Sequence, residues 1–161
     1  MPSRAFKVRI ATPKDIDVLV HQRHMMHEEM RHRSGEEHRI GDVSYRKWAV
    51  QKMRKKLFRA FIVTDPKGRV AGGGAVWLRE VQPSPGRPAR LSPYLMSVYT
   101  EPGFRRKGVA TRIVREAEKW ARKEGYEEMV LHASRPGRKV YPQLGWERTW
   151  EMRRKLLPPY E

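Results

Sequence analysis

A short turn between an apolar strand and an amphipathic helix constrains this chain more than any other feature of its sequence. The strand is predicted over residues 94–99, and the helix begins at about Arg106. Apolar residues then recur at helical spacing, at Val109, Ile113, Val114, Ala117 and Ala121. The first N–H groups of such a helix are unpaired and lie at the positive end of its dipole. This end of the helix is therefore predicted to attract an anion.

The composition of the turn strengthens that prediction. Gly108 and Ala110 keep bulky side chains away from the backbone, so that an oxygen atom can approach the N–H groups closely. Three basic residues add fixed charge beside them, namely Arg105, Arg106 and Lys107. An ordinary helix start with a basic, solvated turn has the same composition. The more specific interpretation is a site that suits a pyrophosphate group.

Length and composition favour one globular domain over residues 1–161. The chain can bury one full core, whereas two domains would each bury too little surface. It contains no apolar run of membrane-spanning length and no signal-peptide pattern, so we expect a cytoplasmic protein with no membrane partner. Its lack of cysteine excludes disulfides and any covalent intermediate on a thiol.

The strongly basic balance indicates affinity for polyanions. Thirty-five Lys and Arg residues against eighteen Asp and Glu give a formal net charge of +17. The basic residues are spread from Arg4 to Lys155 without a long uninterrupted run. Nucleic-acid binding, a phosphate-rich small ligand and an Arg-rich solvated surface therefore all agree with the charge.

Periodicity and turn signals give an order of elements before the turn. We expect a strand over 6–10, a helix from Pro13 to about Met30, a polar stretch over 31–41, a helix over 44–57, and a hairpin of strands 60–64 and 70–81. The run Gly72-Gly73-Gly74 in the second hairpin strand predicts a bulge or a close backbone approach. A loop over 82–92 leads to the strand and helix described above. An apolar strand over 129–134, a short helix and a final strand complete the order.

Two motifs in this order are similar to those of a known family. The pattern Arg105-x-x-Gly108-x-Ala110 resembles the acetyl-coenzyme A (acetyl-CoA) signature of the GCN5-related N-acetyltransferase (GNAT) superfamily. The stretch Val140-Tyr141-Pro142-Gln143-Leu144-Gly145-Trp146 resembles its Leu-Tyr-x-x-Leu-Gly-Phe element. Residues 131–134, 137–138 and 151–152 are also similar to a bacterial subgroup of uncharacterised N-acetyltransferases. The resemblance implies the α/β GNAT fold, a mixed, mostly antiparallel sheet flanked by helices, with a splayed strand pair that holds the coenzyme.

The resemblance also implies a function. It implies direct transfer of the acetyl group of acetyl-CoA to an amine acceptor through a ternary complex, without a metal, in a protein that can form a homodimer. The positions that correspond to the family's coenzyme contacts are Val98, Tyr99, Thr100, Arg105, Arg106, Lys107, Gly108, Val109, Ala110, Thr111 and Ser134. A basic nucleic-acid-binding module or a coenzyme-sensing module that keeps the fold without catalysis is the alternative.

Two residues are candidates for the proton transfers. Tyr141 resembles the family's proton donor, and a phenol remains protonated at neutral pH until it is needed. Its ring could instead serve only for packing. No Asp or Glu lies within 94–99, where some relatives keep a general base, so His132 near the end of the next strand is the candidate base. A structural role for His132, with water as the base, is the alternative.

Five of the six histidines lie between His21 and His38, which raises the question of a metal site. On a helical wheel the apolar stripe is centred near Arg23 and His27, whereas His21 and His24 turn away from it, so we expect no metal. Arg23 and His27 are instead predicted to face inward. In the family the first helix pair covers the acceptor site, which makes these two residues candidates for substrate binding. Arg23 could alternatively extend to a carboxylate.

Acidic residues are concentrated in the segment between the first two helices. They are Glu28, Glu29, Glu36, Glu37 and Asp42. Such a cluster in a basic protein would attract a cationic amine, and the alternative is a solvated face balanced by neighbouring arginines.

Overall fold

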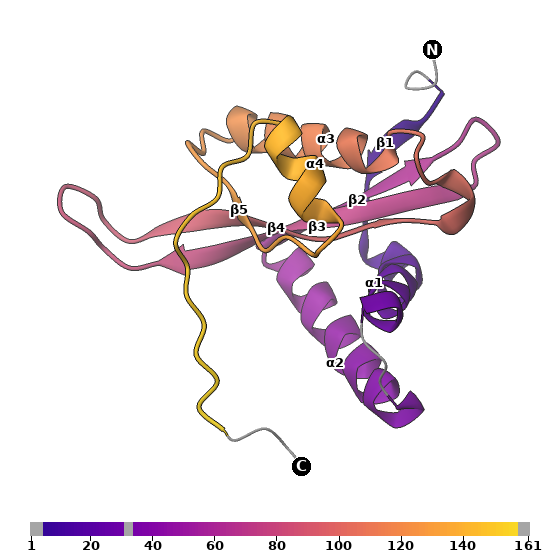
Figure 1. The fold of residues 1–161 in the computed structure, drawn as a ribbon, viewed down its shortest axis with the longest axis horizontal. Coiled ribbons are helices and arrows are strands. Elements are labelled where there is room, and N and C mark those ends of the chain that lie inside the picture. The colour runs from indigo at the N-terminus through magenta and orange to yellow at the C-terminus, as the bar shows by residue number, and fades with distance from the viewer. Residues whose placement is uncertain (1–4, 31–33, 158–161) are drawn as a thin grey trace.

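The computed structural model describes residues 5–30 and 34–157 and shows a five-stranded sheet with helices on both faces (Figure 1). The strand order is β1-β2-β3-β4-β5. Their bounds are β1 Lys7–Ile10, β2 Phe58–Thr64, β3 Val70–Val81, β4 Arg90–Thr100 and β5 Val130–Leu131. The first four strands are antiparallel neighbours, and β5 runs parallel to β4. The expected mixed, mostly antiparallel sheet is therefore confirmed.

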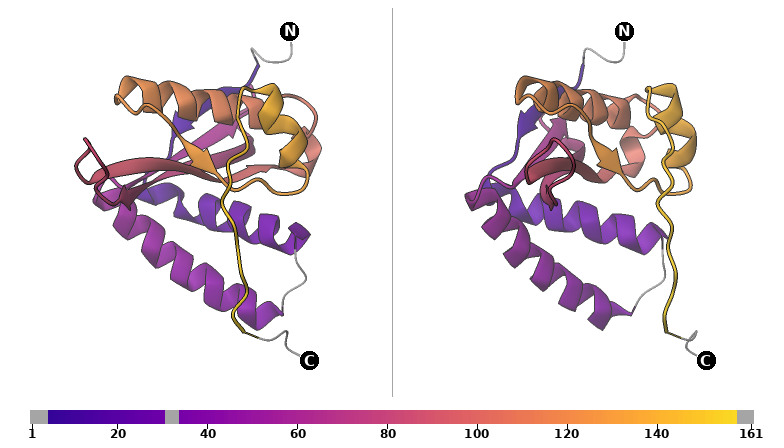
Figure 2. Two further views of the ribbon diagram at one scale, coloured as in Figure 1. Left: turned by 60° about the vertical axis from the view of Figure 1, so that its left-hand side comes forward. Right: turned by 90° about the vertical axis from the view of Figure 1, so that its left-hand side faces the viewer.

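The helices form a layer on each face of the sheet, as Figure 2 shows. Helices α1 (Ile16–Met30) and α2 (Gly35–Arg54) cover one face, and α3 (Val109–Lys123) and α4 (Gly137–Gln143) cover the other. Short 3-10 turns, η2 (Pro13–Asp15) and η3 (Pro102–Phe104), precede α1 and α3. Side chains along β2 point to alternate faces of the sheet and so reach both helix layers. Phe58 and Ile62 pack with α1 and α2, whereas Phe61 packs with α3. None of the helices in the described ranges is long and apolar enough to cross a membrane.

The glycine run of β3 lies where the sheet, α1 and α3 come closest. A Cβ atom on Gly72 would lie 2.4 Å from the Tyr99 carbonyl oxygen, and one on Gly73 would lie 2.3 Å from Gln22 Oε1. The β3–β4 register shifts between Gly73 and Ala75. Ser97, on the β4 side of this shift, has φ 55°. Both predicted features, a bulge and a close approach, are confirmed.

Helix α2 begins well before the predicted start at residue 44. Its first residue is Gly35, and its N-cap is Ser34, whose side chain accepts a hydrogen bond from the Glu37 N–H. The Glu37 carboxylate in turn accepts one from the Ser34 N–H at 2.9 Å, which completes a capping box. The prediction was wrong here because the high polarity of residues 31–41 concealed this local start signal.

Three other predicted bounds were also wrong. Strand β4 begins at Arg90 because the far end of β3 continues to pair with residues 90–93. Helix α3 begins at Val109 and not at Arg106, since Arg106 (φ 61°) and Gly108 (φ 81°) have left-handed backbone conformations. Strand β5 contains two residues instead of six.

The predicted final strand does not form within residues 144–157. The chain there leaves the sheet as an extended tail (Figures 1 and 2). Trp150 and Met152 in this tail are 90% and 91% exposed. With only two residues, β5 offers too short an edge for a further strand to pair with.

Candidate active site

The sheet opens between β4 and β5. These strands pair only at Tyr94 with Val130 and at Leu95 with Leu131, after which β5 ends and β4 continues to Thr100. Within the described chain, the β4 edge beyond Leu95 therefore has no partner strand on this side. Val98, Tyr99 and Thr100 lie on that stretch, with side chains that are buried or half-buried. Backbone groups along this edge are therefore available to a ligand.

The predicted anion site lies directly after this edge. The N–H of Glu101 donates to the Ala71 carbonyl at 2.8 Å, which anchors the turn to β3. Helix α3 then begins after Gly108, and no side chain caps its first turn. Gly108 is the N-cap and has a left-handed conformation, and the N–H groups of Val109, Ala110 and Thr111 form the first turn of the helix. An uncapped helix start of this kind binds phosphate groups.

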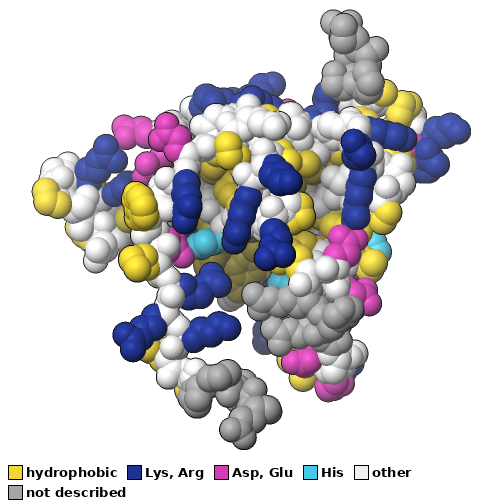
Figure 3. Space-filling view, in the orientation of Figure 1, with side chains coloured by type: hydrophobic (Ala, Val, Ile, Leu, Met, Phe, Trp, Pro, Cys, Tyr) yellow, Lys and Arg dark blue, Asp and Glu magenta, His cyan; other side chains and the backbone are white. Residues whose placement is uncertain are grey.

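The three basic residues of the turn have different surroundings. The Arg105 guanidinium donates to the Glu29 carboxylate at 2.6 Å and to the Thr100 carbonyl at 3.1 Å. It therefore ties the end of α1 to the turn. Arg106 and Lys107 are exposed and add positive charge at the helix start. Figure 3 shows further Lys and Arg side chains across the middle of this face of the molecule.

Tyr141 lies on α4, on the same face of the sheet as α3. It packs against the apolar cluster that contains Leu95 and Val114, and its ring centroid is 5.9 Å from that of Trp146. Burial raises the pKa of the Tyr141 phenol above its usual value. The group therefore stays protonated well above neutral pH, as a proton donor to a leaving thiolate requires.

Helix α4 is held against α3 by hydrogen bonds around Glu118. This buried carboxylate accepts from Trp146 Nε1 at 2.9 Å and from Arg115 at 3.0 Å. Arg115 also donates to the Leu144 carbonyl at 3.2 Å. Trp146 is half-buried, packs against the core cluster and fixes the end of the segment that carries Tyr141.

Ser134 lies at the start of α4, close to Tyr141. Its Oγ atom is 3.4 Å from the Gly137 N–H, and a Cβ atom on Gly137 would lie 2.8 Å from the Tyr141 ring. The predicted coenzyme contact and the predicted proton donor thus belong to one small region. Gly137 is required there because a larger residue would displace the tyrosine.

His132 follows β5 and lies in the middle of a chain of three side chains. The Tyr94 hydroxyl is 2.8 Å from His132 Nδ1, and the Glu151 carboxylate is 2.6 Å from His132 Nε2. The hydrogen bond with His132 holds the pKa of Glu151 below its usual range, and burial raises the pKa of Tyr94. The imidazole is thus oriented at both nitrogens, next to the point where β4 and β5 separate.

Tyr94 and Glu151 were not predicted as site residues. They are 38 and 19 residues from His132 in the sequence, and no local spacing indicates their contact. The Tyr94 ring also contacts Trp77, which places Tyr94 on the face covered by α1 and α2. Tyr141 and the Tyr94–His132 pair therefore lie on opposite faces of the sheet.

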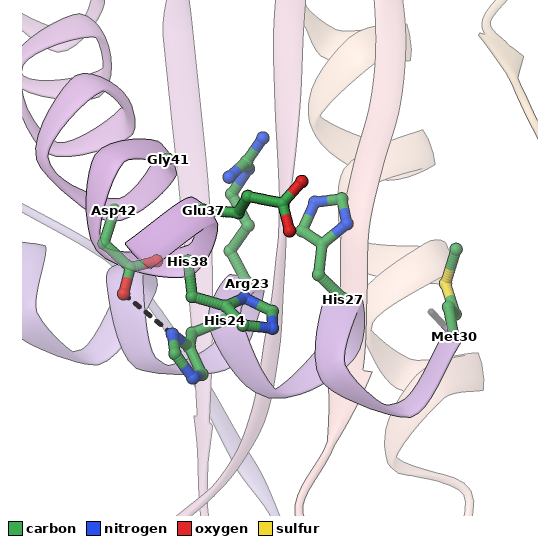
Figure 4. A pocket seen from close by; sticks show the side chains of 8 residues that line it. All are labelled: Arg23, His24, His27, Met30, Glu37, His38, Gly41 and Asp42. Atoms are coloured by element: carbon green, nitrogen blue, oxygen red, sulfur yellow. Dashed lines mark hydrogen bonds and ion pairs between the residues drawn. The ribbon is translucent and has the colours of Figure 1, made fainter. Parts of the chain in front are cut away.

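The second predicted site lies in a cavity of about 380 Å³ between α1 and α2 (Figure 4). Its lining includes both residues predicted to bind the substrate, Arg23 and His27, which are half-buried. The Arg23 guanidinium lies 4.6 Å from the centroid of the Tyr45 ring. Burial raises the pKa of Tyr45 to about 12, and its hydroxyl forms a hydrogen bond with Ser97. Tyr45 therefore connects the wall of this cavity to the bulge in β4.

His24 was predicted to turn away from the apolar stripe, yet it also lines the cavity. Its Nδ1 atom is 2.7 Å from the Asp42 carboxylate, and its ring stacks on His38 at 4.5 Å between centroids. His24 lies in the cavity because α2 begins early, and its first turns pack beside the side of α1 that carries His24. In Figure 4, Glu37 of α2 and His27 of α1 point toward one another across the opening. No group of three metal-binding side chains occurs within residues 5–30 and 34–157.

The sequence matches a known family over most of these elements. It matches the model of the Acetyltransferase (GNAT) family over residues 23–146, which is more than half of the chain. The chain therefore belongs to the GNAT family of acetyltransferases. The matched range includes Arg23, the turn before α3, and Tyr141. No curated protein matches the sequence.

Solved structures share the fold along nearly the whole chain. A GCN5-related N-acetyltransferase from Ralstonia eutropha JMP134 gives a TM-score of 0.83 at 22% identity and covers 94% of this chain and 98% of its own. A predicted acetyltransferase from Clostridium acetobutylicum, solved with acetyl-CoA, gives a TM-score of 0.79 at 23% identity. The match covers 93% of this chain and 95% of that protein. Aminoglycoside N-acetyltransferase AAC(6')-Iy in complex with CoA gives a TM-score of 0.69 at 18% identity. The match covers 94% of this chain and 95% of that protein.

Proposed function

We propose that this protein is an N-acetyltransferase that transfers the acetyl group of acetyl-CoA directly to an amine. The observation that carries the proposal is the continuous path from the open edge of β4 to the uncapped start of α3. Edge N–H groups suit the pantetheine arm and the thioester oxygen, and the helix start suits the pyrophosphate. The acetyl-CoA and CoA bound in two proteins of the same fold support this assignment.

The two faces of the sheet supply the two proton transfers of the proposed reaction. The neutral amine attacks the acetyl carbon, and the new C–N bond forms while the carbonyl oxygen gains negative charge near the β4 edge. The C–S bond then breaks, and the Tyr141 phenol gives its proton to the leaving thiolate. The Tyr94 hydroxyl takes the proton that the attacking nitrogen releases and passes its own proton to His132 Nδ1, while the Glu151 carboxylate holds the imidazole at Nε2. The proton donor and the base are thus on opposite faces of the sheet, so the leaving thiolate and the attacking amine are served by different groups.

The cavity between α1 and α2 is our candidate for the acceptor site. It touches the β4 bulge through Tyr45, and Arg23 has no carboxylate partner among the described residues. We infer that Arg23 and His27 hold a polar or anionic group of the acceptor. Asp42 and Glu37 contribute negative charge near the same opening, which favours an acceptor that also carries a cationic amine.

Calorimetry and a turnover assay test this proposal together. We expect saturable binding of acetyl-CoA and acetyl-dependent thiol release with a panel of amines. The competing interpretation is a basic nucleic-acid-binding module, which would show no saturable acetyl-CoA binding and a salt-sensitive affinity for DNA or RNA. Saturable coenzyme binding with no thiol release from any amine would instead support a coenzyme sensor. Either of these two results would overturn the enzymatic assignment.

A further inference from the structure

A second cavity, of about 730 Å³, lies at the opposite end of α3 from the turn over residues 100–108, which we propose to bind the coenzyme and call the coenzyme turn. Its lining comes from the C-terminal end of α3 and from β1, β2, β3 and β4. Figure 1 shows the sheet extending past that end of α3 into the projecting β3–β4 hairpin. Trp120 and Tyr126 form one wall, and Ile10, Leu78 and Leu91 lie on the strands below. At 1.5 Å per residue, Trp120 is about 16 Å from Val109 along the helix axis. The groove is therefore separate from the site described above.

One cation in this groove lacks the partner that a half-buried charge requires. The Arg59 guanidinium lies 5.2 Å from the centroid of the Trp120 ring. Among residues 5–30 and 34–157 no carboxylate pairs with it, and its buried Nε atom has no hydrogen-bond partner. Arg69 differs, since it stacks on Phe104 but also bonds to Asp65 at 2.7 Å. A half-buried guanidinium is stabilised most by a carboxylate, and here none is supplied by the described chain.

The rest of the lining also favours a ligand that carries a negative charge. Arg54 and Lys56 add two further cations, and Glu124 is the one acidic residue among those that line the cavity. The remaining lining is mainly apolar or aromatic, and it includes Phe58 and Met53. A volume of this size falls within the range of about 300–1,000 Å³ that small-molecule sites occupy. Shape, apolar lining and charge together describe a site for a small ligand with a flat apolar body and one negative end.

We propose that this groove binds a small aromatic carboxylate. The aromatic ring lies against Trp120 and Tyr126, and the carboxylate accepts hydrogen bonds from Arg59, with Lys56 adding charge at the opening. No covalent step is involved. The site is independent of acetyl transfer, since none of its lining residues belongs to the coenzyme turn or to the cavity between α1 and α2.

The direct test is isothermal titration of the full chain with 2-naphthoate and with 2-naphthamide. Both probes have the same ring system, but only the first is charged. We expect one saturable site for 2-naphthoate and binding at least about tenfold weaker for the amide, because a charge-assisted hydrogen bond is lost. Saturating acetyl-CoA should not displace 2-naphthoate. Equal affinity for both probes, or displacement by acetyl-CoA, would overturn the proposal.

Variants of the lining residues test whether 2-naphthoate binds in this groove. Arg59→Gln should weaken 2-naphthoate binding by about tenfold or more and leave 2-naphthamide binding nearly unchanged. Arg79→Gln is the matched control, because Arg79 stacks on Tyr94 at 4.2 Å on the other face of the sheet, and its binding curve should equal that of the wild type. If Arg59→Gln lowers the melting temperature, Ile10→Glu provides a second test, since Ile10 is 49% exposed and the new carboxylate would repel the probe. Wild-type affinity in a folded Ile10→Glu variant would contradict the assignment.

Discussion

The coenzyme turn and the cavity between α1 and α2 are built in opposite ways. The turn is one continuous segment, and it offers backbone N–H groups from the β4 edge and the start of α3. The cavity is assembled from two helices and offers side chains, among them Arg23, His27 and Asp42. Backbone groups depend little on side-chain identity, so they suit the part of the reaction that is common to all acceptors. Side chains suit the part that differs between acceptors. In the proposed reaction the two regions therefore control different kinetic constants.

The largest effect is expected from Tyr141→Phe, which removes only the proton that the thiolate receives. Turnover should fall by about 100-fold, within the range that general acid catalysis contributes, while the dissociation constant of acetyl-CoA stays nearly the same. Steady-state kinetics and calorimetry measure the two quantities. Tyr126→Phe is the matched control, since its ring packs on Trp120 at 6.0 Å much as Tyr141 packs on Trp146. Full activity of Tyr141→Phe would limit this residue to packing.

Gly108→Val tests the backbone site directly. The branched side chain would cover the start of α3, and we expect acetyl-CoA affinity to fall by at least about tenfold as charge-assisted hydrogen bonds are lost. Gly68→Val is the control for backbone strain, because Gly68 and Gly108 have φ of 80° and 81° and neither Cβ position has a neighbour within 4 Å. Both variants should lose stability, but only Gly108→Val should lose coenzyme affinity. Equal coenzyme affinity in the two variants would remove the turn from the proposed site.

The chain of Tyr94, His132 and Glu151 predicts a change in the pH profile. His132→Gln should lower turnover by about tenfold at neutral pH, and most of the turnover should return at high pH, where solvent can take the proton that the attacking nitrogen releases. Glu151→Gln should also lower turnover, because it removes the carboxylate that orients the imidazole at Nε2. Because the pKa of Glu151 is lowered, its carboxylate stays charged through the pH range in which a glutamate usually titrates. The charge is lost only as the pH falls below that range.

Glu147→Gln serves as the control for this profile, since Glu147 is exposed and belongs to the same extended tail. Its profile should coincide with that of the wild type. Unchanged profiles for both His132→Gln and Glu151→Gln would leave water as the base.

The smallest effect is expected for the acceptor side, where several side chains share the contact. The double change Arg23→Leu and His27→Leu should raise the Michaelis constant for the acceptor by about five- to tenfold, with acetyl-CoA affinity nearly intact and the protein folded. Arg46→Leu is the control, because Arg46 is exposed on α2 and pairs with Asp17 of α1 at 2.6 Å. Wild-type kinetics in the double variant would place the acceptor elsewhere.

The difference between these two regions also explains how much of the protein was predictable. The strand, turn and helix around Gly108 were read from local periodicity, and the bounds of β3 were predicted correctly at 70 and 81. The start of α2 was misplaced although a local signal, the Ser34 and Glu37 capping box, was present. The two-residue length of β5 had no local signal, because an apolar run shows only that residues are buried and not how far a ladder continues.

By itself the sequence determined the family's fold and identified the turn before α3 and Tyr141 as candidate site residues, because each depends on residues close together in the chain. Only the tertiary structure decided that Tyr94 and Glu151 meet His132, that His24 joins Arg23 in one cavity, and that Tyr141 and His132 lie on opposite faces of the sheet. Local backbone preferences and hydrophobic periodicity act over a few residues. Contacts between distant side chains depend on how whole elements pack, and no short segment contains that information.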